Sequence, residues 1–371
     1  MKTTARAGLA LWPLLCVACG TPSAPSPEPS VSPGPRAFLL SLSTEAHRDA
    51  VLRSTAIGDD GRLGESRDLP LAAIPGGPFV DVQRGLVFII EDDLVGTALY
   101  QPTLVRYRLD PRTGALLAYG RARFGAPSVH HPSVAASLHP SGRFLYTAGG
   151  GGPGEVYGYR LETGSALAVE PLPGSPFTSR EAHGYPGVGA PMVSPSGRFA
   201  WSRASIIYKT QGLLSFRVSA ETGALELVGT MRVYDGESNL APDPQERFAF
   251  QVAGGFLRRW WTYGIDRDSG ALSQAGDSEP LRPVYAYRLL ALPSGRWLVA
   301  ADGEGTVRSL EVSADGRLAA RQDLPLSDDL DVVLAAHERT VYLASQGRLR
   351  ALRLDEASGA MEVLQELAAP A

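Results

Sequence analysis

The chain has 371 residues, of which 44% are hydrophobic and 20% are charged, and its formal net charge is −4. This apolar share can fill a sizeable core, which excludes a disordered or fibrous chain. The mild acidity does not favour binding to nucleic acid or to an anionic membrane surface.

Residues 1–18 have the pattern of a bacterial export signal. Lys2 and Arg6 precede an apolar stretch at residues 8–15, which is too short to span a membrane because a span needs about 20 apolar residues. The segment ends in Cys-Val-Ala-Cys-Gly, which resembles a lipobox with cleavage before Cys19 and a lipid on its thiol. An ordinary secretory signal is the alternative, because a cysteine stands where a lipobox usually has leucine.

Residues 19–35 are rich in proline and serine and are expected to form an extended tether. Gly20 follows the cysteine, where aspartate is linked to retention at the inner membrane. We therefore expect a lipid-anchored protein of the cell envelope, held at the outer membrane. Cys16 and Cys19 are the only two cysteines of the sequence, so the mature chain is expected to contain no disulfide and no cysteine metal site.

A repeating unit fills residues 36–371 and is clearest at residues 139–177. It reads as a Pro-Ser-Gly turn, a strand at residues 143–148, a second strand at 156–161, a tight turn and a third strand at 166–172. Aromatic and β-branched residues favour strands, and glycine and proline separate them.

Two markers recur seven times along the chain. An arginine opens one strand of each unit, at Arg36, Arg84, Arg143, Arg198, Arg247, Arg296 and Arg339. A glycine marks a tight turn, at Gly61, Gly114, Gly164, Gly223, Gly270, Gly316 and Gly359. A β-only unit of roughly 40–50 residues is typical of a propeller blade. We therefore predict an all-β fold, a seven-bladed β-propeller over residues 36–371.

Blade one differs from the other six. Blades two to seven each show an innermost strand before the arginine, whereas blade one has only the Pro/Ser-rich tether there. We expect either three strands in blade one or a fourth strand from the end of the tether. The strand-opening arginines are expected to be structural, and Trp260 and Trp261 to serve packing between blades.

The motifs PSGRFLY at residues 140–146, VYGYRL at 156–161 and PGSPF at 173–177 resemble the lactonase seven-bladed propeller family. That family includes the propeller-type 6-phosphogluconolactonase, so the resemblance implies a propeller and lactone hydrolysis. The family begins innermost strands with a Pro-x-His segment, where this chain has Ala135 and Ala190. We therefore expect a module that binds a small molecule or a protein, with a lactone hydrolase outside the cytoplasm as the alternative.

In a propeller, the loops after the second strand of each blade share one face with the connections between blades. Loops on a rigid scaffold commonly carry binding and catalytic residues. The candidates on this face are His130, His131 and His183, which adjacent blades would bring together as a general base. Arg203 or Arg288 would stabilise an oxyanion. Packing of the loops is the alternative role for the histidines.

A metal site is a weaker alternative on the same face. Glu91, Asp92 and Asp93 would supply its oxygen ligands. No spacing of the His-Glu-x-x-His type supports a metal, and we expect no cofactor.

Overall fold

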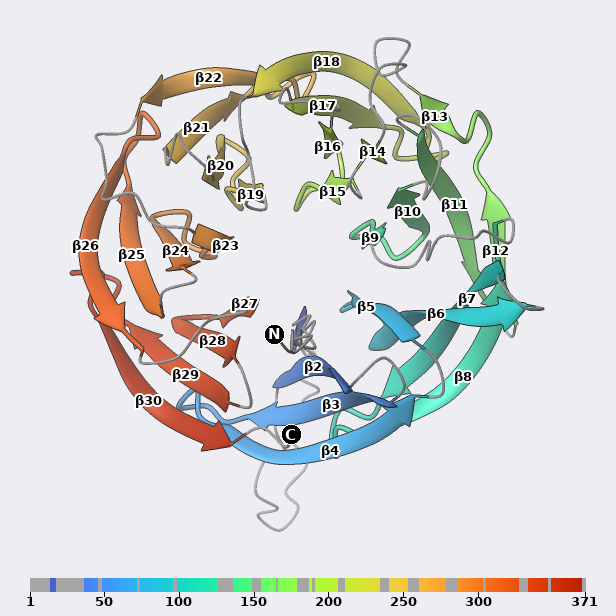
Figure 1. Cartoon of the computed structure of the whole chain (residues 1–371), viewed down its shortest axis with the longest axis horizontal. Coiled ribbons are helices and arrows are strands. Elements are labelled where there is room, and N and C mark those ends of the chain that lie inside the picture. The colour runs from blue at the N-terminus through green and yellow to red at the C-terminus, as the bar shows by residue number, and fades with distance from the viewer. Residues whose placement is uncertain are drawn as a thin grey trace, which may run out of the picture.

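The computed structural model describes residues 14–17, 37–45, 49–71, 74–95, 99–125, 136–148, 155–164, 166–178, 187–188, 191–205, 211–233, 240–252, 260–277, 286–302, 305–326, 333–345 and 348–368. These residues form strands and turns and contain no helix. The strands make seven antiparallel sheets arranged around a central axis, which confirms the predicted seven-bladed β-propeller (Figure 1).

Each blade holds its strands in chain order from the axis to the rim. Blade one contains β1 (Leu14–Val17), β2 (Ala37–Glu45), β3 (Asp49–Ile57) and β4 (Leu63–Leu71). Blade two contains β5 (Ile74–Asp81), β6 (Leu86–Val95), β7 (Leu99–Leu109) and β8 (Leu116–Arg123). Blade three contains β9 (Ala136–Leu138), β10 (Phe144–Ala148), β11 (Glu155–Thr163) and β12 (Leu167–Pro171), and β13 (Phe177–Thr178) also pairs with β11.

Blade four has two short pieces, β14 (Gly187–Val188) and β15 (Met192–Val193), beside β16 (Phe199–Ser205), followed by β17 (Gln211–Val218) and β18 (Leu225–Val233). Blade five contains β19 (Ala241–Pro242), β20 (Phe248–Val252), β21 (Trp260–Ile265) and β22 (Leu272–Asp277). Blade six contains β23 (Ala286–Ala291), β24 (Trp297–Asp302), β25 (Thr306–Val312) and β26 (Leu318–Pro325). Blade seven contains β27 (Val333–His337), β28 (Thr340–Ser345), β29 (Arg348–Leu354) and β30 (Met361–Ala368).

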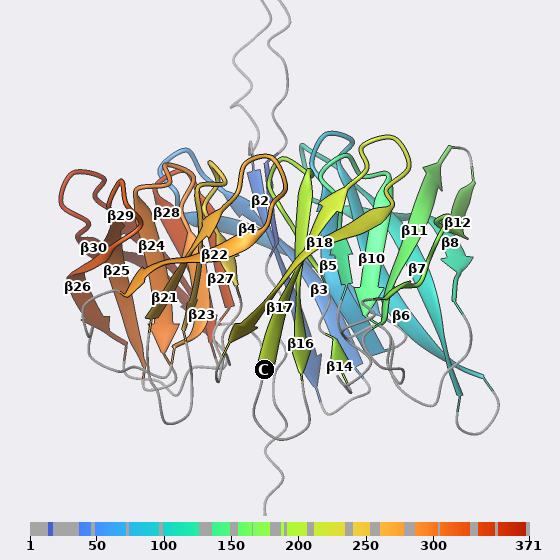
Figure 2. The same cartoon turned by 90° about the horizontal axis from the view of Figure 1, so that it is seen from above.

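Antiparallel connections give the ring two different faces, seen edge-on in Figure 2. The turn face carries the turns between the first and second and between the third and fourth strands, at residues 82–85 and 110–115 in blade two. The loop face carries the opposite strand ends, including those of β6 and β8. The sequence predicts the candidate site for the loop face.

The core is divided among the spaces between blades. Side chains alternate along each second strand, so one set faces the preceding blade and the other the following blade. In β6, Val87 and Ile89 pack against blade one, whereas Phe88 and Ile90 pack against blade three. Seven such apolar clusters occur among the described residues, one at each junction. Each blade is therefore stabilised mainly by its neighbours.

A ring of hydrogen bonds joins the blades near the turn face. The carbonyl oxygen of each marker glycine accepts a hydrogen bond from the blade before it. The donor–acceptor pairs are Ser54–Gly114, Arg106–Gly164, Tyr146–Gly223, Trp201–Gly270, Thr262–Gly316, Ser309–Gly359 and Tyr342–Gly61, at 2.5 to 3.4 Å. The regular spacing of the glycines in the sequence thus reflects a contact that is repeated at every junction.

Blade seven closes the ring on blade one with these same contacts. The Tyr342 hydroxyl donates to the Gly61 carbonyl at 2.9 Å. The Gln365 side chain accepts the Leu63 amide proton at 2.7 Å and donates to the Leu63 carbonyl at 3.0 Å. Gln322 bonds Met361 in the same way between blades six and seven. The closing junction therefore resembles the internal ones.

Blade one has four strands, and its innermost strand is β1. Leu14 to Val17 pair with Leu40 to Ala37 of β2. The expectation of three strands is therefore wrong, as is the expectation that the tether's end supplies the fourth. This strand precedes the tether and lies within the segment predicted to be an export signal.

The structure supports the structural roles expected for two groups of residues. Trp260 packs between blades five and six, and Trp261 packs between blades four and five. Strand-opening arginines stack on the following aromatic ring and donate to backbone carbonyls of the next blade, at Arg143, Arg198, Arg247 and Arg296.

Candidate functional site

The polar side chains of the turn face hold the blades together. His139 is buried there, and its Nε2 lies 2.9 Å from the Gly197 carbonyl oxygen of the next blade. Its Nδ1 accepts the Ser141 backbone N–H at 3.1 Å, so the ring proton lies on Nε2 and is donated to Gly197. Burial lowers the pKa of His139 from 6.5, which keeps the ring neutral. His139 is thus a structural histidine.

Carboxylates occupy the equivalent turns of blades two and five, where each accepts a hydrogen bond from the strand-opening arginine of its own blade. Asp81 accepts a hydrogen bond from Arg84 at 2.8 Å, and Asp243 accepts one from Arg247 at 2.7 Å. Both carboxylates are almost fully buried. These buried polar groups of the turn face are therefore engaged in the turns themselves.

The loop face carries the two candidate arginines that the structure describes. Arg203 lies near the end of β16 and shares a strand side with Trp201, which packs between blades four and five. Arg288 lies on β23, the strand of blade six that borders the axis, and its side chain is exposed. The two arginines come from blades four and six, so blade five stands between them. Both lie near the loop-face ends of their strands.

The candidate histidines and the lipidation site lie outside the described residues. These are His130, His131, His183 and Cys19. Their proposed roles remain predictions.

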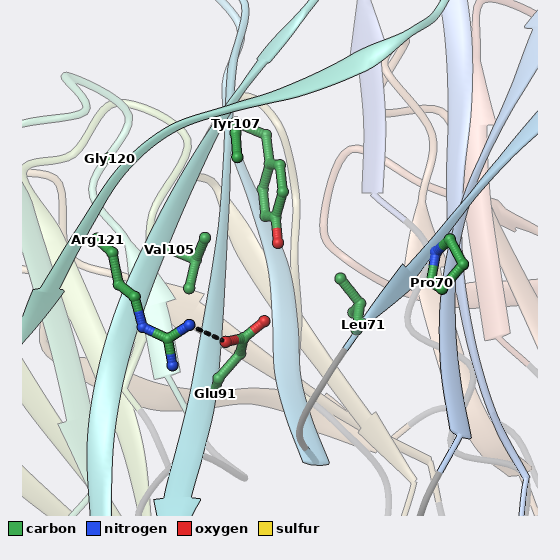
Figure 3. A pocket seen from close by; sticks show the side chains of 8 residues that line it. Pro70, Leu71, Glu91, Val105, Tyr107, Gly120 and Arg121 are labelled. Carbon is green, nitrogen blue, oxygen red and sulfur yellow. Dashed lines mark ion pairs between the residues drawn. The ribbon is translucent and has the colours of Figure 1, made fainter.

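Glu91 takes a position that the sequence did not reveal. Its side chain lies on the same side of β6 as Val87 and Ile89 and faces blade one. The carboxylate is 3% exposed, and its Oε2 lies 3.2 Å from Nη1 of Arg121 on β8 (Figure 3). The pKa of Tyr107 is raised to about 12, mainly by burial and secondly by the nearby charge of Glu91.

These three side chains line a cavity of about 380 Å³ between blades one and two. Its other lining residues are Pro70, Leu71, Val105, Ala118 and Gly120. We call it the rim cavity, because it lies between the outer strands β4, β7 and β8 (Figure 3).

Sequence reasoning missed Arg121 and Tyr107, and only their strand alternation offered a signal. β8 places Arg121 beside Val105, and β6 places Glu91 beside Thr103, so the pair is brought together across β7. Asp92 and Asp93 pair through their backbones with Pro102 and Gln101, and their side chains lie outside the described part.

Comparison with solved structures identifies related architectures. A periplasmic gluconolactonase from Pseudomonas aeruginosa aligns with 90% of this chain and 96% of its own, with a TM-score of 0.65 and 20% identity. A candidate 6-phosphogluconolactonase from Bacteroides uniformis aligns over 86% and 92%, with a TM-score of 0.62 and 16% identity. A protein from Lactobacillus plantarum aligns over 97% of both chains, with a TM-score of 0.63 and 15% identity. This chain has the lactonase-type propeller fold.

The sequence matches no protein-family model and no curated protein. At these identities the likeness concerns the fold, and function depends on the residues of the site. In the part of this lactonase-type propeller that the structure describes, no three His, Cys, Asp or Glu side chains gather closely enough to hold a metal ion. Among the same residues, no helix is long and apolar enough to cross a membrane.

Proposed function

We propose that this propeller binds a small polyhydroxylated ligand of the sugar-lactone class on its loop face, outside the cytoplasm. The observation that carries the proposal is the alignment with a periplasmic gluconolactonase over 96% of that chain. Arg203 and Arg288, near the loop-face ends of β16 and β23, support it further.

Hydrolysis of the bound lactone is the second candidate, because two of the aligned proteins are described as lactonases. A histidine at position 130, 131 or 183 would remove a proton from water as it attacks the lactone carbonyl. An arginine would stabilise the negative charge that develops on the carbonyl oxygen. The ring C–O bond then breaks, the leaving oxygen takes the proton back from the histidine, and the product is a hydroxy acid, which releases its carboxyl proton at neutral pH.

The decisive experiment measures binding and turnover in the purified full chain. Binding of D-gluconate is followed by NMR line broadening, and acid release from a panel of sugar and aliphatic lactones is followed in a pH-stat. The variants are Arg203→Gln, Arg288→Gln, His131→Ala and His183→Ala. His337→Ala is the matched control, because His337 ends β27 at the turn face.

Binding that weakens at least fivefold in either arginine variant, with the His337→Ala protein unchanged, is the expected result. Turnover that disappears in a histidine variant would establish hydrolysis. If neither gluconate nor any lactone binds or reacts, or if the arginine variants behave as the parent, the proposed function is wrong.

We also propose that the chain is anchored by a lipid on Cys19, with cleavage before this residue, so the mature protein would lack β1. The support is the lipobox-like sequence before this residue, together with the location given for the Pseudomonas aeruginosa protein, which is periplasmic. Metabolic labelling with an alkyne fatty acid tests the anchor. Label should appear in the parent and vanish in Cys19→Ser; equal label in both proteins contradicts it.

A further inference from the structure

The rim cavity has the features of a small-molecule site that is separate from the loop face. Its volume of about 380 Å³ falls in the range of roughly 300–1,000 Å³ that is common for ligand pockets. It lies where β4 ends at Leu71, between the outer strands of blades one and two. Arg203 and Arg288 belong to blades four and six, so they take no part in it.

The opening follows from a small residue on one wall. Ala118 of β8 presents only a methyl group to the cavity, whereas Val105 and Tyr107 of β7 form its buried floor. Ala118 and Pro70 are exposed, so the cavity opens to solvent at the rim. A ligand can therefore enter from the side without any movement of the blades.

The charges of the cavity balance one another. Glu91 is buried, and burial of a carboxylate is costly unless a cation or hydrogen-bond donors compensate for it. Arg121 provides that cation at 3.2 Å, with half of its side chain exposed. Tyr107 adds a phenol, which is protonated at neutral pH and so can donate a hydrogen bond. Carboxylate, guanidinium and phenol together offer both acceptors and donors without a net charge.

An anionic ligand would be repelled by the Glu91 carboxylate, and a cationic ligand would be repelled by the Arg121 guanidinium. A hydroxyl group suits both partners, because it donates to the Glu91 carboxylate and accepts from the Arg121 guanidinium. The apolar walls at Pro70, Leu71 and Val105 can contact the C–H groups of a ring. We propose that the rim cavity is a binding site for a neutral monosaccharide, with Glu91, Arg121 and Tyr107 as its polar contacts.

The test uses the purified full chain with D-glucose, D-galactose and D-mannose as neutral probes, and D-glucosamine and D-glucuronate as charged analogues. Binding is measured by saturation-transfer-difference NMR titration. Tyr107→Phe removes one hydroxyl and keeps the ring. Its affinity should fall about 3- to 10-fold, as expected for one hydrogen bond.

Two further variants avoid the ion pair and so avoid a folding defect. Ala118→Leu narrows the exposed mouth of the cavity and should weaken binding at least fivefold. Leu117→Ala is the matched control, because Leu117 is 61% exposed and lies on the other side of the same strand. Arg288→Gln on the loop face should also leave monosaccharide binding unchanged, which separates this site from the proposed function.

The proposal is overturned if no neutral sugar binds, or if Tyr107→Phe and Ala118→Leu bind as tightly as the parent. Tighter binding of glucosamine or glucuronate than of glucose would also overturn it, because the neutral class would then be wrong. Loss of sugar binding in Arg288→Gln would place the sugar on the loop face instead.

Discussion

Replacing Gly61 with alanine tests how blade seven closes on blade one. Gly61 has a φ of 79°, in the left-handed region that glycine adopts readily. A Cβ atom at this position would lie 2.2 Å from Oγ1 of Thr340, which is buried at the start of β28. The Tyr342 hydroxyl donates to the Gly61 carbonyl beside this contact. The substitution therefore strains the backbone and separates the two blades.

The expected loss combines three effects. A left-handed conformation costs an alanine about 1–2 kcal/mol. Overpacking of a tight contact costs about 1–3 kcal/mol, and a weakened buried hydrogen bond costs about 0.5–1.5 kcal/mol. The three costs do not add in full, because small shifts of the surrounding atoms relieve several of them at once. We therefore expect the free energy of unfolding to fall by about 2–4 kcal/mol. At about 2 °C per kcal/mol for a domain of this size, Tm should fall by roughly 4–8 °C.

Gly164→Ala is the matched control at the equivalent turn of blade three. A Cβ atom at Gly164 would meet no atom within 4 Å, so Tm should not fall. Differential scanning calorimetry of the parent and the two variants makes the comparison. If the Tm of Gly61→Ala equals that of the parent and of Gly164→Ala, close packing at Gly61 does not hold the ring closed, and the reasoning is refuted.

Three further predictions concern ring closure, pH and blade one. Tyr342→Phe and Tyr146→Phe each remove one equivalent hydrogen bond between blades. Each should lower the free energy of unfolding, measured by denaturant titration, by about 1 kcal/mol. A much smaller loss in Tyr342→Phe would show that the closing junction is weaker than the internal one. Because burial lowers the pKa of His139, the unfolded chain binds its proton first, and stability should decline as pH falls below about 6.5. The His139→Gln protein should lose that part of the decline between pH 7.5 and 5, and an unchanged pH profile of Tm would contradict this role. A protein of residues 36–371 lacks β1 but keeps the Tyr342 and Gln365 contacts, so it should retain β-sheet circular dichroism and one cooperative transition, whereas a non-cooperative melt would show that β1 is required.

Much of the fold could be predicted because its signals are local. Alternating side chains predicted the strands of blade three at residues 156–161 and 166–172, and the structure places β11 and β12 there. The tight-turn glycines predicted the number of blades, because each one occupies a fixed point of its unit. The ends of the strands were less accurate, since pairing extends β11 to Glu155 and Thr163.

The candidate site was predicted less completely. The repeat predicted the loop face for Arg203, because the direction of a strand follows from its order in the blade, and the role of Arg203 and Arg288 in a site stays a prediction. The partner of Glu91 could not be inferred, because Arg121 lies two strands away and the facing side of each strand depends on the register. The histidines at positions 130, 131 and 183 keep their roles as predictions.

The sequence by itself determined the all-β class, the seven units and the glycine turns, because alternation and turn chemistry act over a few neighbouring residues. Only the tertiary structure decided the contacts that span the ring. Tyr342 meets Gly61 across 281 residues, and β1 rather than the tether lies beside β2. The rim cavity likewise forms between residues of two blades, where β4 ends at Leu71 and Ala118 of β8 lies opposite. These contacts depend on the curvature of the closed ring, which no local pattern encodes.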